Sequence, residues 1–308
     1  MKLSVVTTLY KSKPFLEIFL IEIVKTIGKL QIESYELLFV NDGSPDDSLA
    51  YLLERKKDIA QIKIIDLSRN FGHHYAMQAG LDYAAGDYIF LIDNDLETPP
   101  DVLIDYYNEM KADPSLDVVY GFQELRKGNF IEKKAGSIFW TIINKLSETK
   151  IPHNILTERL MTRQYVKELL RMQDANLFLG GMFYWVGFNQ KGLPVKKGKR
   201  EGASTYSFKR RAELMLQAIT SFTGKPLEWL FYFGLMISFG SVIFLLYLIT
   251  EKIIYRDQVQ FGWTSIIAIN VLILGVISTF LGIIGIYIYK IFKQVQGRPN
   301  AIIKKVYE

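Results

Sequence analysis

Two long stretches without a charged residue constrain the fold of this chain more than any other feature. Residues 229–250 form the first stretch and residues 258–289 the second. As a helix, the first alone extends about 33 Å, enough to cross the hydrocarbon core of a bilayer. A pair of buried core helices is the alternative, but these apolar runs are longer than core helices need. We therefore expect a hairpin of two transmembrane helices over residues 227–290.

The flanks of the hairpin predict its anchoring and orientation. Aromatic residues that suit a membrane interface lie near the expected ends, namely Trp229, Tyr232, Trp263, Tyr287 and Tyr289. Basic residues precede the first helix and follow the second, namely Lys209, Arg210, Arg211, Lys225, Lys290, Lys293, Arg298, Lys304 and Lys305. The short connecting loop instead balances two basic against two acidic residues. Because positive charge favours the cytoplasmic side, we expect a multi-pass protein of the inner membrane with both termini in the cytoplasm.

We expect the hairpin to act as a membrane anchor and not as a transport pathway. Neither stretch carries an internal charge, which disfavours transport. Small residues that permit close helix packing are present, and a homo-oligomer is expected. They are Gly234, Gly240, Gly282 and Gly285.

Composition excludes several other classes of protein. The chain of 308 residues has no cysteine, so disulfides and cysteine-based zinc sites are excluded and a reducing compartment fits. The formal net charge is +5, but the basic residues gather near the apolar stretches and not in a separate stripe. A lipid bilayer is therefore the expected partner, and nucleic acid is not. No signal peptide is expected, because Lys11, Lys13 and Glu17 interrupt the apolar start.

The N-terminal part of the chain alternates between two hydrophobic patterns. Short apolar, β-branched runs predict buried strands over residues 3–9, 35–40, 62–67, 88–92 and 116–120. Helical periodicity predicts helices over residues 14–30, 47–57, 74–85 and 101–111. This alternation implies an α/β fold with a mostly parallel sheet and helices on both faces. Ligands of such sheets bind at the carboxyl ends of the strands, so the polar residues there are site candidates.

Two carboxylates follow the fourth expected strand. Asp93 and Asp95 come directly after the apolar run YIFLI, and Glu97 lies close behind. Such hard oxygen ligands suit Mg²⁺ or Mn²⁺, which often share their coordination with substrate phosphates. A cation there would offset negative charge on a leaving diphosphate. Alone, the pair also fits a loop or a helix cap before Pro99.

Other polar segments fit simpler interpretations. Residues 42–44 are a strong turn signal, Arg69 and His73 fit solvated surface positions, and His74 fits a partly buried one. No histidine is assigned to a metal, because none has further His ligands at a suitable spacing. A basic loop over residues 196–206 is either a solvated run or a site for a lipid phosphate.

Taken in order, these segments resemble a known family. They read SVVTTLY, NDGSPDDS, SRNFGHHYAMQAGLDYAAGD, DNDLETPPD, YGFQELRKG, ERLMTR, GGMFYWVGF, REGASTYS and TSFTGKPL, followed by the apolar stretches. The combination covers nearly the whole chain and is similar to the family 2 glycosyltransferases that act on polyprenyl phosphate. That group includes dolichol-phosphate mannose synthases and the bacterial undecaprenyl-phosphate glucosyltransferases of O-antigen modification. The hairpin favours the bacterial branch.

The resemblance implies a GT-A (Rossmann-like) fold and a metal-dependent, inverting transfer of one sugar. The expected donor is a nucleotide-sugar, with glucose and UDP as sugar and carrier, and the expected acceptor is polyprenyl phosphate. Four parts are then expected along the chain. They are a cytoplasmic catalytic domain (1–205), an interfacial juxtamembrane segment (206–226), the hairpin (227–290) and a cytoplasmic basic tail (291–308).

By position, the resemblance also assigns site residues. Donor contacts are implied for Thr8, Tyr10, Asp42, Ser68, Arg69, Asp93 and Asn94. Metal contacts are implied for Asp93, Asp95 and Glu97. Phosphate contacts and the closing loop are implied for Arg126, Arg159, Lys199, Arg200, Ser204 and Tyr206. Catalytic roles are implied for Asp93, Asp95, Glu158 and Arg159.

The chain departs from the family pattern at three places. Residues 8–12 read TLYKS where P-x-Y-N-E is usual, and Glu97 stands where Gln is common. Thr157 stands where some members carry an Asp proposed as a base. A phosphate monoester is largely ionised at neutral pH, so it needs little help from a base. We therefore expect catalysis to rest on positioning and electrostatics.

Other functions stay open at this stage. The sugar could be mannose or an amino- or deoxysugar, and the acceptor another lipid. A membrane scaffold on a degenerate transferase domain is the non-enzyme alternative. Metal-dependent binding of a nucleotide diphosphate separates the enzyme from the scaffold.

Overall fold

One mixed sheet organises the first of two units into which the chain divides. The computed structural model describes residues 2–123, 152, 154–196, 198, 225–254 and 263–308. The first unit comprises Met1–Ala218 with Arg298–Glu308, and the second comprises Ile219–Gly297.

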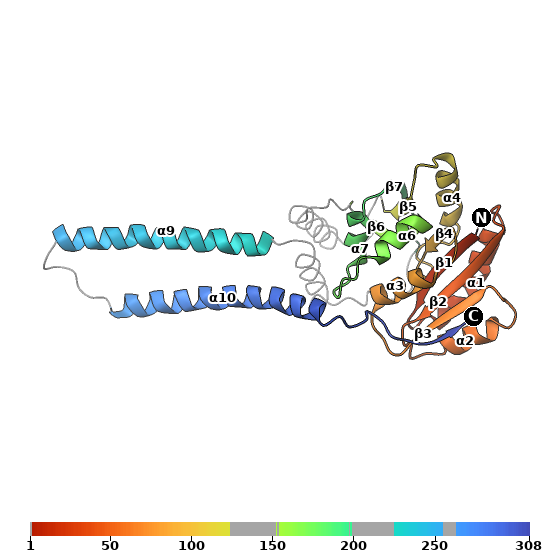
Figure 1. Cartoon of the computed structure of the whole chain (residues 1–308), viewed down its shortest axis with the longest axis horizontal. Helices are drawn as coiled ribbons and strands as arrows, with labels where there is room; N and C mark the ends of the chain where they lie inside the picture. The colour runs from red at the N-terminus through yellow and green to blue at the C-terminus, as the bar shows by residue number, and fades with distance from the viewer. Residues whose placement is uncertain (1, 124–151, 153, 197, 199–224, 255–262) are drawn as a thin grey trace. The chain divides into compact units, whose positions relative to one another are not determined.

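The sheet has parallel strands at its centre. Its eight strands stand in the order β7-β5-β6-β4-β1-β2-β3-β8 (Figure 1). They are β1 (Lys2–Leu9), β2 (Ser34–Asn41), β3 (Ile62–Leu67), β4 (Tyr88–Leu91), β5 (Val118–Phe122), β6 (Ile155–Thr162), β7 (Gln190–Pro194) and β8 (Ile303–Tyr307). β1 pairs in parallel with both β2 and β4, and β2 with β3, so these strands all end at one edge of the sheet. β6 is antiparallel to β4 and β5, and β8 is antiparallel to β3.

Helices cover both faces of the sheet. Those of the first unit are α1 (Lys13–Ile27), α2 (Ser48–Arg55), α3 (His73–Tyr83), α4 (Val102–Ala112), α6 (Arg163–Leu170) and α7 (Leu179–Trp185). Val5 of β1 belongs to the core cluster that includes Phe19 of α1 and Tyr106 of α4. The next residue, Val6, faces the other side, where a Cβ at Gly80 of α3 would lie 2.5 Å from it. This alternation is what a strand buried on both faces requires.

The expected strands and helices of the N-terminal part are confirmed, with shifts of a few residues at their ends. The largest shift is at α1, which ends at Ile27 because Gly28 takes the C-cap position. Three strands had no counterpart in the expectation, namely β6, β7 and β8. All three run at the sides of the parallel core, and each mixes polar with apolar residues, so its hydrophobic periodicity is weak.

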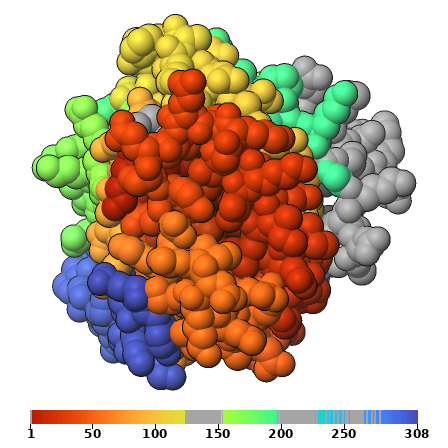
Figure 2. Space-filling view, turned by 90° about the vertical axis from the view of Figure 1, so that its right-hand side faces the viewer, coloured from red at the N-terminus to blue at the C-terminus, as the bar shows by residue number. Residues whose placement is uncertain are grey.

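The C-terminal residues return to the first unit as an edge strand. β8 pairs with β3, and Ser68 N donates to Ile302 O at 2.9 Å. Figure 2 shows these residues, in dark blue, against the orange segments of the N-terminal half. The part expected as a basic tail, 291–308, therefore contributes a strand to the sheet.

In its described residues, the second unit contains two long apolar helices. They are α9 (Lys225–Ile254) and α10 (Trp263–Val295). Within the described residues, one segment, Gly275–Val295, has the length and hydropathy of a membrane span. The two-span hairpin stays a prediction.

A buried carboxylate joins the amino ends of the central strands. Glu36 of β2 is only 4% exposed and accepts hydrogen bonds from Ser4 Oγ at 2.5 Å and Ala85 N at 2.6 Å. Lys63 Nζ lies 3.1 Å from it. Burial alone would raise the pKa of Glu36, but these hydrogen bonds and the Lys63 charge outweigh burial and lower it.

Glu36→Gln should destabilise the fold in a pH-dependent way. The ionised carboxylate contributes stability above its ordinary pKa of 4.5, and this is lost as pH falls through the lower pKa of the folded state. We expect a loss of about 2 kcal/mol at neutral pH that narrows in acid. Denaturant unfolding at several pH values measures it, with the exposed Glu22→Gln as matched control. A difference in the free energy of unfolding between Glu36→Gln and the unsubstituted protein that stays constant down to about pH 3 would contradict the assigned charge of Glu36.

Candidate functional site

The carboxyl ends of β1, β2 and β4 bring the main candidate residues together. Thr8 lies near the end of β1, Asp42 follows β2, and Asp93 follows β4. Asn94 links two of these ends, since its Nδ2 donates to Thr8 O at 2.8 Å. The parallel pairing of β1 with β2 and β4 thus brings these polar strand ends to one edge of the sheet.

A histidine lies between two of these strand ends. His73 Nδ1 is 3.0 Å from Thr8 Oγ1, and His73 Nε2 is 3.3 Å from Asp93 Oδ1. Partial burial would by itself lower the pKa of His73, but the hydrogen bond and charge of Asp93, with Asp42 and Asp95, raise it. Since the ring is still 49% exposed, solvent screens much of this effect. The sequence interpretation gave His73 no role in the site, although its place in SRNFGH was a usable signal.

Asp42 fixes the loop that carries this histidine. Its side chain is buried, and its carboxylate accepts from Phe71 N at 2.7 Å and Gly72 N at 3.0 Å. Burial raises the pKa of Asp42 although these two hydrogen bonds oppose the rise. Both carboxylate oxygens therefore bind this protein's own backbone, and the implied contact with a nucleoside stays a prediction.

The turn after β2 lies against the same loop. Gly43 has φ +59°, and a Cβ there would lie 2.5 Å from Asn70 N and 2.7 Å from Arg69 C. Only glycine combines this conformation with so close a backbone approach. The turn signal read from the sequence is thus also a packing requirement.

The Asp-x-Asp loop is ordered by its own backbone. Asp95 Oδ1 accepts from Glu97 N at 3.1 Å, and Leu96 has φ 60°. Glu97 O accepts from Gly198 N at 2.7 Å. Gly198, near the start of the basic loop, therefore contacts the Asp-x-Asp loop. Lys199 and Arg200 follow Gly198 in the chain but lie outside the described residues.

The carboxylates of this site suit a divalent cation whose coordination is completed by the substrate. In the described part of the chain, no group of three or more His, Asp or Glu side chains converges as a metal cage. Mg²⁺ commonly binds through one or two carboxylates together with substrate phosphates, and needs no such cage. Asp93 and Asp95 supply such a pair beside the strand ends, and the implied third ligand, Glu97, stays a prediction.

Arg159 and Glu158, two neighbouring residues of β6, are both buried. Arg159 is 1% exposed, and its Nε and Nη2 donate to the carbonyls of Thr157 and Leu156, both at 3.1 Å. Its guanidinium carbon lies 3.3 Å from the ring centre of Phe183, and burial lowers its pKa. The side chain therefore packs in the interior, and the implied contact of Arg159 with a phosphate stays a prediction.

Glu158 is also buried, at 1% exposure, and precedes Arg159 on β6, so it points to the opposite face. Burial raises the pKa of Tyr106, and the nearby charge of Glu158 raises it further. The implied catalytic role of Glu158 stays a prediction.

The other predicted residues divide into exposed and undescribed ones. Tyr10 is 51% exposed, and the Arg69 guanidinium stacks on Phe71 at 4.0 Å. Ser68 is exposed, and its backbone N donates to the O of Ile302, just before β8. The remaining expected residues lie outside the described part, namely Arg126, Lys199, Arg200, Ser204 and Tyr206.

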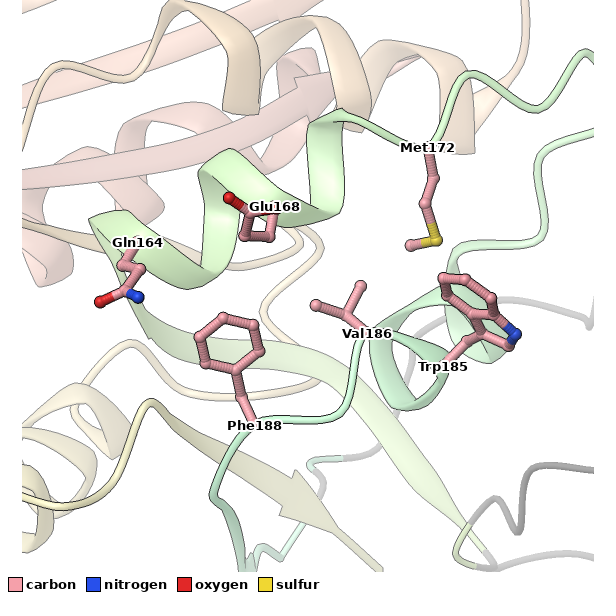
Figure 3. A pocket seen from close by; sticks show the side chains of 6 residues that line it. All are labelled: Gln164, Glu168, Met172, Trp185, Val186 and Phe188. Carbon is pink, nitrogen blue, oxygen red and sulfur yellow. The ribbon is translucent and has the colours of Figure 1, made fainter.

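A separate surface pocket shares no residue with this site. It has a volume of about 360 Å³ and lies between α6 and the end of α7 (Figure 3). Gln164 and Glu168 line it from α6, and Trp185, Val186 and Phe188 from the facing segment.

The strand-end site lies within a segment that matches a known family. Residues 4–170 match the family described as Glycosyl transferase family 2. The chain belongs to glycosyltransferase family 2. Thr8, Asp42, His73, Asp93 and Asp95 all lie inside the matched segment. The protein is therefore a glycosyltransferase.

Relatives within glycosyltransferase family 2 match over most of the chain. An uncharacterized glycosyltransferase of Bacillus subtilis, YkcC, is 36% identical over 277 residues, 89% of this chain and 85% of the relative. The SfII prophage-derived bactoprenol glucosyl transferase of Shigella flexneri is 29% identical over 307 residues, 99% of this chain and 98% of the relative.

A solved structure of similar fold is a mannosyltransferase from Pyrobaculum calidifontis, determined with GDP-Man and Mn²⁺. It is 14% identical, with a TM-score of 0.50, and the match covers 96% of this chain and 86% of that one. The likeness supports a GT-A-like fold with a mostly parallel, mixed sheet.

Gly43→Ala should destabilise the fold far more than Gly187→Ala. Both glycines have positive φ, but a Cβ at Gly187 meets nothing within 4 Å. The left-handed conformation alone costs an alanine about 1 kcal/mol, and the clash at Gly43 adds about 2 kcal/mol. Denaturant unfolding of the two variants measures the difference. Equal losses would show that the close approach of the two loops has no energetic weight.

Proposed function

We propose that this glycosyltransferase moves a single sugar from a nucleotide diphosphate to polyprenyl phosphate at a membrane surface, with inversion. Glucose carried by UDP is the first candidate donor. The observation that carries the proposal is the cluster of Thr8, His73, Asp93 and Asp95 at the carboxyl ends of β1 and β4. The acceptor is proposed because a bactoprenol glucosyl transferase matches along 99% of the chain, the apolar helices included.

The donor diphosphate is proposed to bind at the Asp-x-Asp loop. Asp93 and Asp95 would hold Mg²⁺ or Mn²⁺ there, and the cation would offset the negative charge of the leaving nucleotide diphosphate. Thr8 and Asn94 fix the neighbouring strand end, while Asp42 and Gly43 hold the loop on the other side. These contacts preorganise the site before the donor arrives.

The acceptor needs little activation by a base. A phosphate monoester has its second pKa near 6, so it is already a charged nucleophile at neutral pH. The chain's task is to hold two negative groups close together and in line. Lys199 and Arg200 are proposed for this, since Gly198, directly before them, is hydrogen-bonded to Glu97 beside the Asp-x-Asp loop.

The two apolar helices are proposed to cross the membrane as a hairpin. α9 and α10 have the lengths required, and Gly275–Val295 also has the hydropathy. With basic flanks on both outer ends, the catalytic unit and both termini are proposed to lie on the cytoplasmic side of the inner membrane. The homo-oligomer stays a prediction.

Asp95→Asn should lower kcat/KM by at least about 100-fold, because it removes a ligand charge from the proposed cation site. Thr157→Ala should lower it only a few-fold, since the acceptor needs no strong base. Initial rates with UDP-glucose and a short polyprenyl phosphate measure both, and Asp82→Asn on the exposed side of α3 is the matched control. Equal losses in the Asp95 and Thr157 variants would contradict catalysis by positioning and charge.

Replacing the second unit by a soluble linker should separate nucleotide binding from lipid transfer. The replacement keeps Arg298–Glu308, because a simple cut after residue 225 would also delete β8 from the sheet. This variant should bind UDP like the full chain, yet transfer poorly to a long-chain acceptor in vesicles. Transfer is followed with radiolabelled donor. Undiminished transfer to the long-chain lipid would contradict the anchoring role of the helices.

A donor screen distinguishes this function from its alternatives. Product masses after incubation with UDP-glucose, GDP-mannose or an amino-sugar donor identify the sugar and the acceptor lipid. Failure to bind any nucleotide diphosphate with Mn²⁺ would favour a membrane scaffold on a degenerate transferase domain.

A further inference from the structure

We propose that His73 is a positioning residue that fixes the Asp93 carboxylate for the cation and diphosphate of the donor. The inference rests on the proposed function, because it concerns the same site. Its basis is the pair of contacts made by one imidazole ring, 3.0 Å to Thr8 Oγ1 and 3.3 Å to Asp93 Oδ1. One side chain thus connects the ends of two neighbouring parallel strands, β1 and β4.

The chemistry of the partners assigns the protons of the ring. An ionised carboxylate only accepts hydrogen bonds, so the nitrogen that faces Asp93, Nε2, carries a proton. A hydroxyl both donates and accepts, so Thr8 can donate to Nδ1 of a neutral ring. Each polar group in the series Thr8 to His73 to Asp93 thus lies next to a group of matching chemistry. A carboxylate that binds the imidazole by one oxygen is held in orientation, as second partners of metal ligands commonly do.

The backbone around His73 holds the ring in place. His73 is the first residue of α3, and the Asp42 carboxylate binds the two amides just before it, Phe71 N and Gly72 N. α3 in turn lies tightly on the sheet, since a Cβ at Gly80 would be 2.5 Å from Val6 and 2.8 Å from Val40. A ring held at its base by these contacts can restrain Asp93 instead of following it.

Direct metal ligation by His73 is the competing role, and the geometry favours positioning. The ring nitrogens face Thr8 and Asp93, so both are engaged with protein groups. A nitrogen that carries a proton toward a carboxylate is not available as a ligand. The neighbouring His74 provides a matched comparison, since its ring contacts Leu177 O at 3.4 Å and packs against Phe178.

Three substitutions separate the two contacts of the ring. The side-chain amide of Gln reaches about as far as Nε2, and that of Asn about as far as Nδ1. His73→Gln therefore retains a donor toward Asp93, His73→Asn retains only the Thr8 contact, and His73→Ala retains neither. His74→Gln is the control for a histidine lost from the same helix.

The test measures Mn²⁺ binding to the full chain in detergent with UDP present and no acceptor, by electron paramagnetic resonance. We expect Mn²⁺ affinity to fall roughly 10- to 100-fold in His73→Ala and His73→Asn, and to stay within a few-fold of the unsubstituted protein in His73→Gln and His74→Gln. Thermal unfolding of all four variants shows whether the fold is retained. Spin-echo spectra of bound Mn²⁺ should show no coupling to imidazole nitrogen.

Each opposing result has a distinct meaning. Unchanged Mn²⁺ affinity in folded His73→Ala would overturn the positioning role while leaving the proposed function intact. Imidazole coupling that disappears in His73→Ala would overturn it in favour of direct ligation. If the unsubstituted chain binds no Mn²⁺ with UDP, both the proposed function and this inference fall.

Discussion

The parallel pairing of β1 with β2 on one side and β4 on the other is the constraint on which the rest of the structure depends. Eight consecutive residues of β1 are in register with β2, from Lys2 with Ser34 to Leu9 with Asn41. This register fixes where each strand ends, and so which polar residues emerge at the same edge. If β4 slipped by one residue against β1, its side chains would change faces, and Asp93 would emerge at a different point of the sheet edge. The site is thus a consequence of strand register before it is a consequence of any individual contact.

A second layer of contacts converts this edge into an ordered site. Asp42 and Gly43 act on the loop before α3, Asp42 through two backbone hydrogen bonds and Gly43 through close packing. Buried polar networks of this kind rigidify what they connect when every member is satisfied. Asp42 and Gly43 therefore support the loop that carries His73, whereas Asp93 and Asp95 are the proposed cation ligands.

Sequence patterns predicted the fold well where the chain alternates between long apolar strands and helices. Residues 3–9 and 62–67 are strands because β-branched and apolar runs between turns have few other solutions. β8 escaped prediction because its sequence IKKVY is half polar and it pairs with a strand more than 200 positions away, a partner that no local signal names.

The site was predictable in its carboxylates and less so in its supports. Asp93 and Asp95 could be found because they directly follow a buried strand. The two partners of His73 could not be predicted, because Thr8 lies on β1 and Asp93 follows β4, both distant in the sequence, although the place of His73 in SRNFGH was a signal for the site. The burial of Arg159 against Phe183 could not be predicted, because the resemblance assigned it a phosphate contact by position and local sequence does not show tertiary packing.

The central claim is that the nucleotide diphosphate meets a divalent cation at the ends of β1 and β4. The most direct measurement is an anomalous difference map at the manganese edge from the full chain with UDP-glucose and Mn²⁺. The account predicts one manganese peak bonded to Asp93 or Asp95 and to the donor diphosphate, with His73 touching Asp93 but not the metal. A nucleotide bound at another part of the sheet, or manganese away from both carboxylates, would contradict it.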